Sequence, residues 1–223
     1  MKTQDTTLAT PDRQYWSLAV LASVPIVALA WTRWSTATFG ERILRDAIVY
    51  GALSVGLAAG YDGSLREELG WTLDRETAIA AVGLTVFVLP FYVVGASLPA
   101  VRNAYPMWGV TLEFPGYLVH ALGLLVLTVV AETYFRGLLC VGLRHLGPAA
   151  IVVHVPVYVL VHVPRPTIEM ALSAGVGLLF GWVAYRTRSI FPVVVAHFVG
   201  LVVLDVMVSL PPLFPDAHAY LPV

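Results

Sequence analysis

A glutamate and an arginine stand four residues apart in one of the most apolar parts of the chain. Glu132 and Arg136 lie within residues 117–146, where most positions are Leu, Val, Ala, Gly or aromatic. An ionisable side chain at membrane depth is costly to insert, so it marks a functional-site candidate. Two later apolar segments each contain a histidine, His162 and His197. A carboxylate, a guanidinium and two imidazoles that converge inside a membrane can form a hydrolytic site.

The composition of the chain predicts an integral membrane protein. Of its 223 residues, 58% are hydrophobic and only 12% are charged, whereas soluble domains average about 25% charged residues. The mean hydropathy is +0.80. The net charge of -1 and the lack of a basic run give no sign of a nucleic-acid partner.

The positioning elements are expected to be membrane-spanning helices in an all-α bundle. A span needs about 20 apolar residues, and no repeat divides the chain, so we expect one integral membrane domain over 1–223. The second span is the weakest, because Arg45 and Asp46 stand at its entrance. About seven spans are predicted, at 15–32, 44–60, 77–97, 116–140, 147–163, 169–186 and 190–209.

The ends of the chain's apolar segments carry weaker signals. Trp31, Arg33 and Trp34 follow the first apolar segment like an interfacial anchor, so we expect a retained helix. With seven spans, basic residues favour the N-terminal side by seven to five, which predicts a cytoplasmic N-terminus.

One lysine among 13 basic residues is typical of GC-rich prokaryotic genomes, so we expect a prokaryotic cell membrane. In the second loop, we expect Glu67 and Glu68 to be solvated.

Glu132 and Arg136 have the favoured order for an ion pair one helical turn apart. A purely structural pair that pins two helices remains an alternative. Small residues pack membrane helices together more simply, which favours a functional reading. The adjacent Gly137 allows another helix to approach closely.

The two histidines are weak signals when each is considered alone. His162 ends the fifth predicted span, and Tyr158 lies one turn before it on the same face. His197 lies more than one turn inside the seventh span, after Pro192, a residue suited to the first turn of a helix. Either histidine alone is compatible with a structural role.

Other titratable residues are weaker candidates. His120 lies eleven residues before Ala131, about 16 Å along a helix, and so outside the same site. His154 precedes Pro156 by two residues, and we expect a structural role at a kink. Asp205 lies in apolar sequence, where a proton path and a helix-pairing role are both possible.

A metal site is not expected. Two imidazoles and a carboxylate can bind zinc, but the helical His-Glu-x-x-His signature is absent from the sequence. The single cysteine, Cys140, excludes an internal disulfide and a cysteine-based zinc site. We predict neither a metal nor another cofactor.

Three motifs in order resemble a known family. They are Glu132-Thr-Tyr-Phe-Arg136, Tyr158-Val-Leu-Val-His162, and the segment that runs through Phe-Pro-Val-Val-Val-Ala to His197. This order resembles the CAAX-processing and bacteriocin-processing (CPBP, or Abi) intramembrane endopeptidases. That family carries Glu-Glu-x-x-x-Arg, Phe-x-x-x-His and His-x-x-x-Asn on separate membrane helices.

The resemblance covers a core of roughly 116–205. It implies a hydrolase that cleaves a membrane-associated protein or peptide, lipidated or plain, by a glutamate-type mechanism without metal. In the family the first glutamate activates water, the histidines assist it, and the arginine and asparagine support the site. The implied catalytic set in this sequence is therefore Glu132, Arg136, His162 and His197.

This chain departs from the family pattern at two positions that matter. The first glutamate of the family falls on Ala131, and the asparagine falls on Leu201. Tyr158 in place of Phe is a milder change. The methyl group of Ala131 cannot accept a proton, so the catalytic base that the resemblance implies is missing.

Three hypotheses therefore remain open. Glu132 replaces the missing base, if a rotated helix, a π-bulge or a shifted register turns it inward, with His162 and His197 orienting water and stabilising the oxyanion. Alternatively, the fold persists without peptidase chemistry, as a membrane binding, immunity or scaffold protein. A proton relay through Glu132, His162 and Asp205 is disfavoured, because transporter-like repeats and broken helices are not seen.

Overall fold

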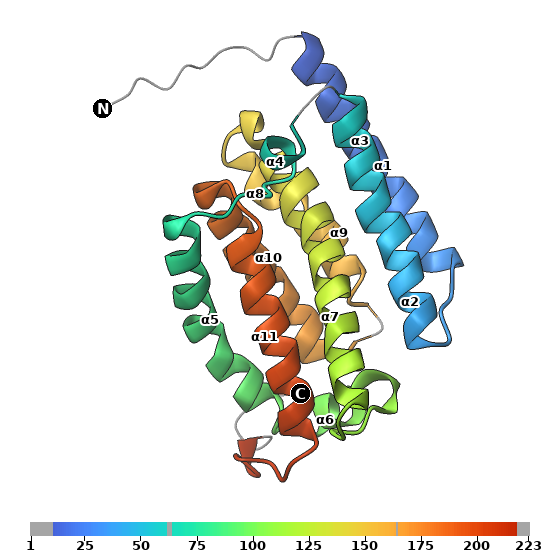
Figure 1. The fold of residues 1–223 in the computed structure, drawn as a ribbon, viewed down its shortest axis with the longest axis vertical. Coiled ribbons are helices and arrows are strands. Elements are labelled where there is room, and N and C mark those ends of the chain that lie inside the picture. Colours follow the sequence, from blue (N-terminus) through green and yellow to red (C-terminus); the bar gives the residue numbers. More distant parts are fainter. Residues whose placement is uncertain (1–10, 62–63, 164, 218–223) are drawn as a thin grey trace.

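The computed structural model describes residues 11–61, 64–163 and 165–217. Every regular element among these residues is a helix, and the long helices lie side by side in one bundle (Figure 1). The predicted all-α class is confirmed. Within the described ranges, six helical segments are long and apolar enough to cross a membrane.

These six segments correspond to six of the predicted spans. Two of them change helix type along their length, because a stretch of π-helix interrupts or ends the α-helix. In chain order they are α1 (Pro11–Arg33); α2 (Phe39–Asp46), η1 (Ala47–Ala52) and α3 (Leu53–Gly60); α5 (Arg75–Gly95); α7 (Gly116–Glu132) and η3 (Thr133–Val141); α10 (Thr167–Thr187); and α11 (Phe191–Val208).

The predicted fifth span, 147–163, is shorter than expected and consists of two helices. These are α8 (Ala149–Val153) and α9 (Val155–Leu160), which meet at His154. Pro156 explains the break, since proline has no N–H to donate and its ring crowds the carbonyl four residues earlier. The kink therefore falls where Pro156 predicts it.

The short α8 and α9 nevertheless return the chain along the bundle. η3 ends beside Gly70, which packs against Val141. α10 ends beside the same residue, because the N–H of Ile190, just after α10, donates to the Gly70 carbonyl at 2.9 Å. Since α7–η3 and α10 both run toward Gly70, the segment between them runs the opposite way (Figure 1). Six long helices and one broken helix thus account for the predicted seven.

Polar caps fix where two of the spans begin. Thr38 caps α2 in a reciprocal box with Glu41, and Asp74 caps α5 in the same way with Thr77. Such boxes satisfy backbone N–H groups that have no partner inside the helix. The hydrogen bond from the Thr77 N–H stabilises the ionised carboxyl and lowers the pKa of Asp74.

The end of the bundle that contains Gly70 is tied to α1 by side chains; we call it the N-terminal end. Arg13 forms an ion pair with Glu68 at 2.9 Å, and the Trp16 indole donates to the Gly142 carbonyl at 2.7 Å. Glu68 is only 6% exposed. The expectation of a solvated Glu68 was therefore wrong, because Arg13 supplies a partner from a distant part of the chain.

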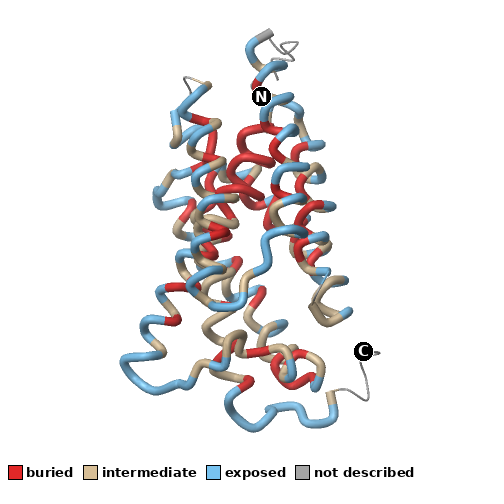
Figure 2. The backbone as a smooth tube through the Cα atoms, turned by 90° about the vertical axis from the view of Figure 1, so that its right-hand side faces the viewer, coloured by how far each residue is buried: buried red, intermediate tan, exposed pale blue. Residues whose placement is uncertain are grey.

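Every residue of η3 is buried, and the buried backbone concentrates in the half of the bundle that contains this segment (Figure 2). Gly137 makes this packing possible. A Cβ atom there would lie 2.7 Å from the Leu69 carbonyl oxygen. The close approach expected at Gly137 is confirmed, but its partner is the loop between the second and third spans and not another helix.

Candidate active site

Glu132 is the last residue of α7 and is wholly buried where the helix changes to η3. Arg136 lies one turn later, and its Nη1 is 3.2 Å from Glu132 Oε1 and 3.1 Å from Oε2. Neither side chain is exposed. The order and spacing in sequence therefore produce an ion pair inside the bundle, as expected for these positions.

His197 completes a contact between two spans. Phe191 and Pro192 begin α11, and His197 lies in its second turn with Nδ1 2.6 Å from Glu132 Oε1. A carboxylate oxygen accepts hydrogen bonds, so the Nδ1–H donates. The lone pair of the neutral ring then lies on Nε2.

His162 has the same tautomer for a different reason. It follows α9, and its Nδ1 lies 2.7 Å from the carbonyl oxygen of Tyr158. A carbonyl can only accept, so this Nδ1 also carries the proton and leaves a lone pair on Nε2. The Tyr158 ring packs edge-on against the imidazole at 4.7 Å between centroids.

Arg136 is held by aromatic faces as well as by the carboxylate. Its guanidinium carbon lies 4.0 Å from the Tyr158 ring centroid and 5.3 Å from that of Phe180. Its Nε and Nη2 atoms have no hydrogen-bond partner among the described residues. Aromatic faces attract cations most strongly away from water, so they help to hold this charge in the bundle.

A cavity of about 440 Å³ lies beside these groups, enclosed mainly by α5, α7, α9, α10 and α11. His162 and His197 form part of its wall, which is otherwise largely apolar. Ala131 and Leu201, the two departures from the family pattern, also line it. Glu132 is not among the lining residues, so His197 stands between the cavity and the buried ion pair.

The π-helical stretch begins at the residue after Glu132. Adjacent residues of a helix point about 100° apart, and here Ala131 faces the cavity while the Glu132 carboxylate contacts Arg136 and His197. The change of helix type therefore accompanies the buried carboxylate but does not place it on the cavity wall.

The remaining titratable candidates lie apart from this group. His120 Nε2 and Asp205 Oδ2 are 2.9 Å apart and form their own buried pair between α7 and α11. His154 donates from Nε2 to the Gly177 carbonyl at 3.1 Å and so ties the α8–α9 break to α10.

Sequence reasoning missed some members of the site. Tyr158 was noted for sharing a face with His162, but its contact with Arg136 has no signal in spacing. Glu169 on the cavity wall was not noted; it accepts from the Tyr105 hydroxyl at 2.8 Å and lies 4.0 Å from Arg165. Burial raises the pKa of Tyr105 well above its usual value, so the hydroxyl remains a donor.

Within the described ranges, no cluster of three or more His, Cys, Asp or Glu side chains is placed to hold a metal ion. The donor set at the site is one carboxylate and one imidazole in direct contact, with the second imidazole bonded to a backbone carbonyl. Its chemistry is that of hydrogen-bonded bases beside a cavity.

The architecture and the site define an integral membrane protein with a buried Glu–Arg–His cluster beside an apolar cavity. Residues 114–202 match the family model described as "Type II CAAX prenyl endopeptidase Rce1-like". The resemblance indicated by the three motifs is thus confirmed over this segment. No curated protein and no solved structure gave a match.

Proposed function

We propose that the protein is an intramembrane endopeptidase that hydrolyses a peptide bond in a membrane-associated protein or peptide. The observation that carries this proposal is the 2.6 Å contact between His197 and Glu132 at the wall of the cavity. A carboxylate bonded to the far nitrogen of an imidazole orients the ring and stabilises the imidazolium that forms during proton transfer.

In the proposed reaction, His197 acts as the general base. Its Nε2 takes a proton from water while the water oxygen bonds to the scissile carbonyl carbon. The imidazolium then lies beside the oxyanion and stabilises its charge. The same proton passes to the departing amine as the carbon–nitrogen bond breaks, so His197 returns to its neutral form.

Glu132 supports this base and does not contact water itself. Its carboxylate holds the Nδ1 proton of His197, and Arg136 balances its charge from the other side. His162 presents its Nε2 lone pair in the same cavity and orients the attacking water by accepting its second hydrogen. All four residues of the expected set thereby have a role without a metal or cofactor.

The substrate is proposed to enter from the bilayer, because the cavity wall is largely apolar and lies among spanning helices. A lipidated segment suits such a wall, and the sequence has no basic run that would indicate a nucleic-acid partner. We also propose a prokaryotic cell membrane with a cytoplasmic N-terminal end, since Arg66, Arg144 and Arg188 add to the basic excess of that end.

Cleavage of a proteome-derived peptide library, prenylated and plain, by protein in nanodiscs tests this function. Wild type is expected to cleave a subset of the library, and His197→Ala and Glu132→Gln are expected to lose the same products. Phe198→Ala on the next position of α11 is the matched control and keeps them. Cleavage that survives His197→Ala in folded protein contradicts the proposed base.

A second candidate function is a binding protein without peptidase activity. Its evidence is that Ala131 and Leu201 place a methyl and an isobutyl group on the cavity wall, where the family pattern has a glutamate and an asparagine. Ala131→Glu and Leu201→Asn restore that pattern. Wild-type protein that binds peptides without cleaving them, together with a double variant that cleaves, supports this second function.

A further inference from the structure

The first turns of the second span hold a cluster of charges that the proposed peptidase does not use. Arg42 and Arg45 both donate to one carboxylate, Asp46, from their Nε atoms. Both guanidinium groups also pack on the same indole ring, with their carbons 4.5 Å and 4.2 Å from the Trp31 centroid. We call Arg42, Arg45, Asp46 and Trp31 the arginine cluster.

The arginine cluster carries one more positive than negative charge. Arg45 and Asp46 are 5% and 2% exposed, and Arg42 is half-buried. Arg45 donates from Nη1 to the Trp34 carbonyl, which supplies no charge. Arg45 Nη2 lies 3.0 Å from Asp46 Oδ1 but has no hydrogen-bond partner among the described residues. A buried cation without a full partner is unfavourable, so the cluster lacks an anion.

Two other carboxylates at this end of the bundle have partners of their own. Glu41 accepts from the backbone N–H groups of Ala37 and Thr38, and Asp205 pairs with His120. Within the described ranges, Asp46 is the carboxylate to which both cations of the cluster donate.

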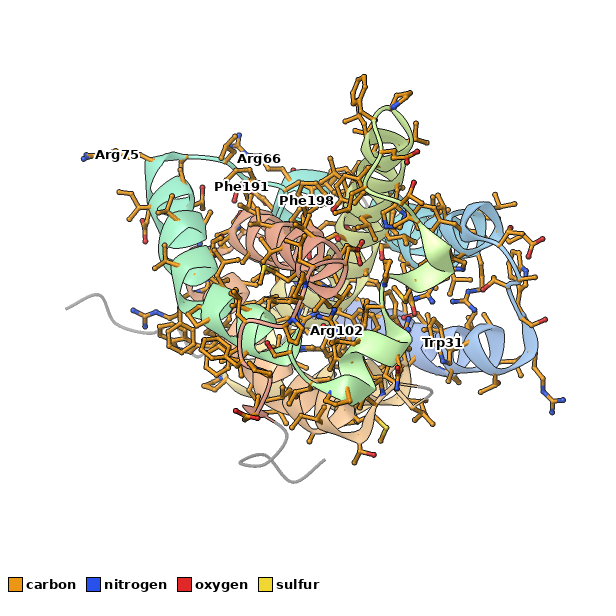
Figure 3. The ribbon with its side chains drawn as sticks, turned by 90° about the horizontal axis from the view of Figure 1, so that it is seen from below. Trp31, Arg66, Arg75, Arg102, Phe191 and Phe198 are labelled. Carbon is orange, nitrogen blue, oxygen red and sulfur yellow. The ribbon has the colours of Figure 1, made fainter. Side chains whose placement is uncertain are left out.

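Arg102, at the same end of the bundle, has several hydrogen-bond acceptors for its guanidinium group. Arg102 donates to backbone carbonyls at the ends of α5 and α11, and Figure 3, viewed from this end, labels it together with Trp31. These carbonyl oxygens belong to Ala96, Met207, Val208 and Leu210. Both Nη atoms of Arg102 thus have acceptors within the chain, whereas Arg45 Nη2 has none among the described residues.

Part of the cluster reaches the cavity. Arg42 and Asp46 belong to the cavity wall. Their neighbour Ile43 packs beside Gly123, which lies eight residues, or about 12 Å, before Ala131 along α7. The cavity thus has a charged end at Arg42 and Asp46, and a largely apolar wall that also contains the two histidines.

The depth of the cluster matches the membrane interface. Phe39 begins the second span and Arg33 ends the first, so Arg42 and Arg45 lie in the outermost turns of the spanning segment. The exposed Trp34 and the adjacent Trp31 are typical of the aromatic belt at headgroup level. Arginine side chains near the ends of spanning helices reach the headgroup level.

We propose that Arg42, with the buried charge of Arg45 beside it on Asp46, binds the phosphate of an anionic phospholipid, one acyl chain of which extends along the apolar wall of the cavity. The phosphate supplies the missing negative charge, and guanidinium groups present donors suited to phosphate oxygens. Lipid binding at this site does not depend on peptidase activity.

Native mass spectrometry of detergent-purified protein tests the site with dioleoylphosphatidylglycerol and dioleoylphosphatidylcholine as probes. Wild type is expected to bind the anionic lipid at least about fivefold more tightly, the effect of one basic residue near a membrane surface. Arg42→Gln is expected to reduce this preference to within about twofold of parity, whereas Arg33→Gln keeps it. Arg33 is the matched control, because it is exposed at the same end.

Two results overturn the proposal: equal affinity of wild type for both lipids, or an unchanged preference in folded Arg42→Gln protein. sn-Glycerol 3-phosphate separates the headgroup from the chains. It is expected to displace the lipid only at concentrations at least a hundredfold higher. If it is as potent as the lipid, the site recognises phosphate alone and the placement of the chain is wrong.

Discussion

Two carboxylate–imidazole pairs join the same two helices, α7 and α11. Glu132 and His197 are 2.6 Å apart, and His120 and Asp205 are 2.9 Å apart. The carboxylate comes from α7 in the first pair and from α11 in the second. Similar chemical groups at similar distances thus occur twice in one helix interface.

Their surroundings differ. The Glu132–His197 pair has a buried cation, Arg136, on one side and the cavity on the other. His120 instead packs against aromatic rings, with centroids 4.8 Å from Phe39 and 6.0 Å from Tyr117, and neither it nor Asp205 lines the cavity.

The comparison shows that a carboxylate–imidazole contact does not by itself indicate a reactive site. A base needs a face toward the substrate, and a buried carboxylate held ionised needs a compensating charge. Only the Glu132–His197 pair has both a face on the cavity and a neighbouring cation. The proposed proton transfer therefore involves this pair, and the His120–Asp205 pair is proposed to join the two helices.

The largest expected effect is on the cleavage rate, which should depend on the Glu132–His197 pair and not on the His120–Asp205 pair. Glu132→Gln is expected to lower kcat by roughly a hundredfold or more, because His197 loses the carboxylate that orients and stabilises it. Asp205→Asn is expected to stay within about threefold of wild type, because it removes no group from the cavity. Single-turnover cleavage of a peptide from the library screen measures both. Equal losses in the two variants contradict the assignment.

The second effect concerns stability. Arg136→Gln is expected to lower the free energy of unfolding by about 3–5 kcal/mol, because it leaves Glu132 buried without its cation. Asp205→Asn is expected to cost about 1–3 kcal/mol, as for a weakened buried hydrogen bond. Unfolding titrations with sodium dodecyl sulfate in mixed micelles compare them. A larger loss in Asp205→Asn reverses the comparison.

Much of the fold followed from the sequence, because apolar length alone predicts spanning helices. The six long helices were predictable from this length, and the break in the fifth span was predictable from Pro156. The ion pair of Glu68 with Arg13 was not, since the two residues are 55 positions apart and nothing local marks their contact.

The candidate site was predictable in part. The helical spacing of Glu132 and Arg136 predicts their contact, and the family resemblance suggested the two histidines. Spacing did not indicate that Ala131 faces the cavity while Glu132 faces α11, because that depends on how the helices pack. The aromatic support of Arg136 by Phe180 likewise arises only from tertiary packing.

A third comparison concerns stability and uses two glycines, Gly137 near the Glu132–His197 pair and Gly123 near the His120–Asp205 pair. A Cβ at Gly137 meets the Leu69 backbone oxygen at 2.7 Å, whereas a Cβ at Gly123 meets the outer atoms of the Phe39 and Ile43 side chains. A backbone cannot move aside as a ring can, so Gly137→Ala is expected to destabilise by about 1–3 kcal/mol. Gly123→Ala is expected to cost under about 1 kcal/mol, offset by better helix propensity.

The same detergent unfolding titration distinguishes these variants. Gly83→Ala serves as the control, since a Cβ at Gly83 meets no atom within 4 Å. If Gly123→Ala destabilises more than Gly137→Ala, the contact of η3 with the loop at Leu69 is less rigid than its geometry indicates.

The smallest expected effect is that of metal removal. Millimolar EDTA or 1,10-phenanthroline is expected to leave the cleavage rate unchanged, because the proposed base is an imidazole supported by a carboxylate. Activity that falls with chelator and returns with added zinc contradicts the metal-free mechanism. Buffer with zinc-saturated chelator controls for direct effects of these compounds on the peptide.

A double-mutant cycle between Glu132 and His197 tests the central claim most directly. If the two residues act as one unit, the double variant Glu132→Gln/His197→Ala is expected to cleave no more slowly than His197→Ala alone. Combining His197→Ala with Asp205→Asn is expected to give the product of the separate effects. Losses for Glu132 and His197 that multiply in the double variant contradict the account, because they mean that the two groups act independently.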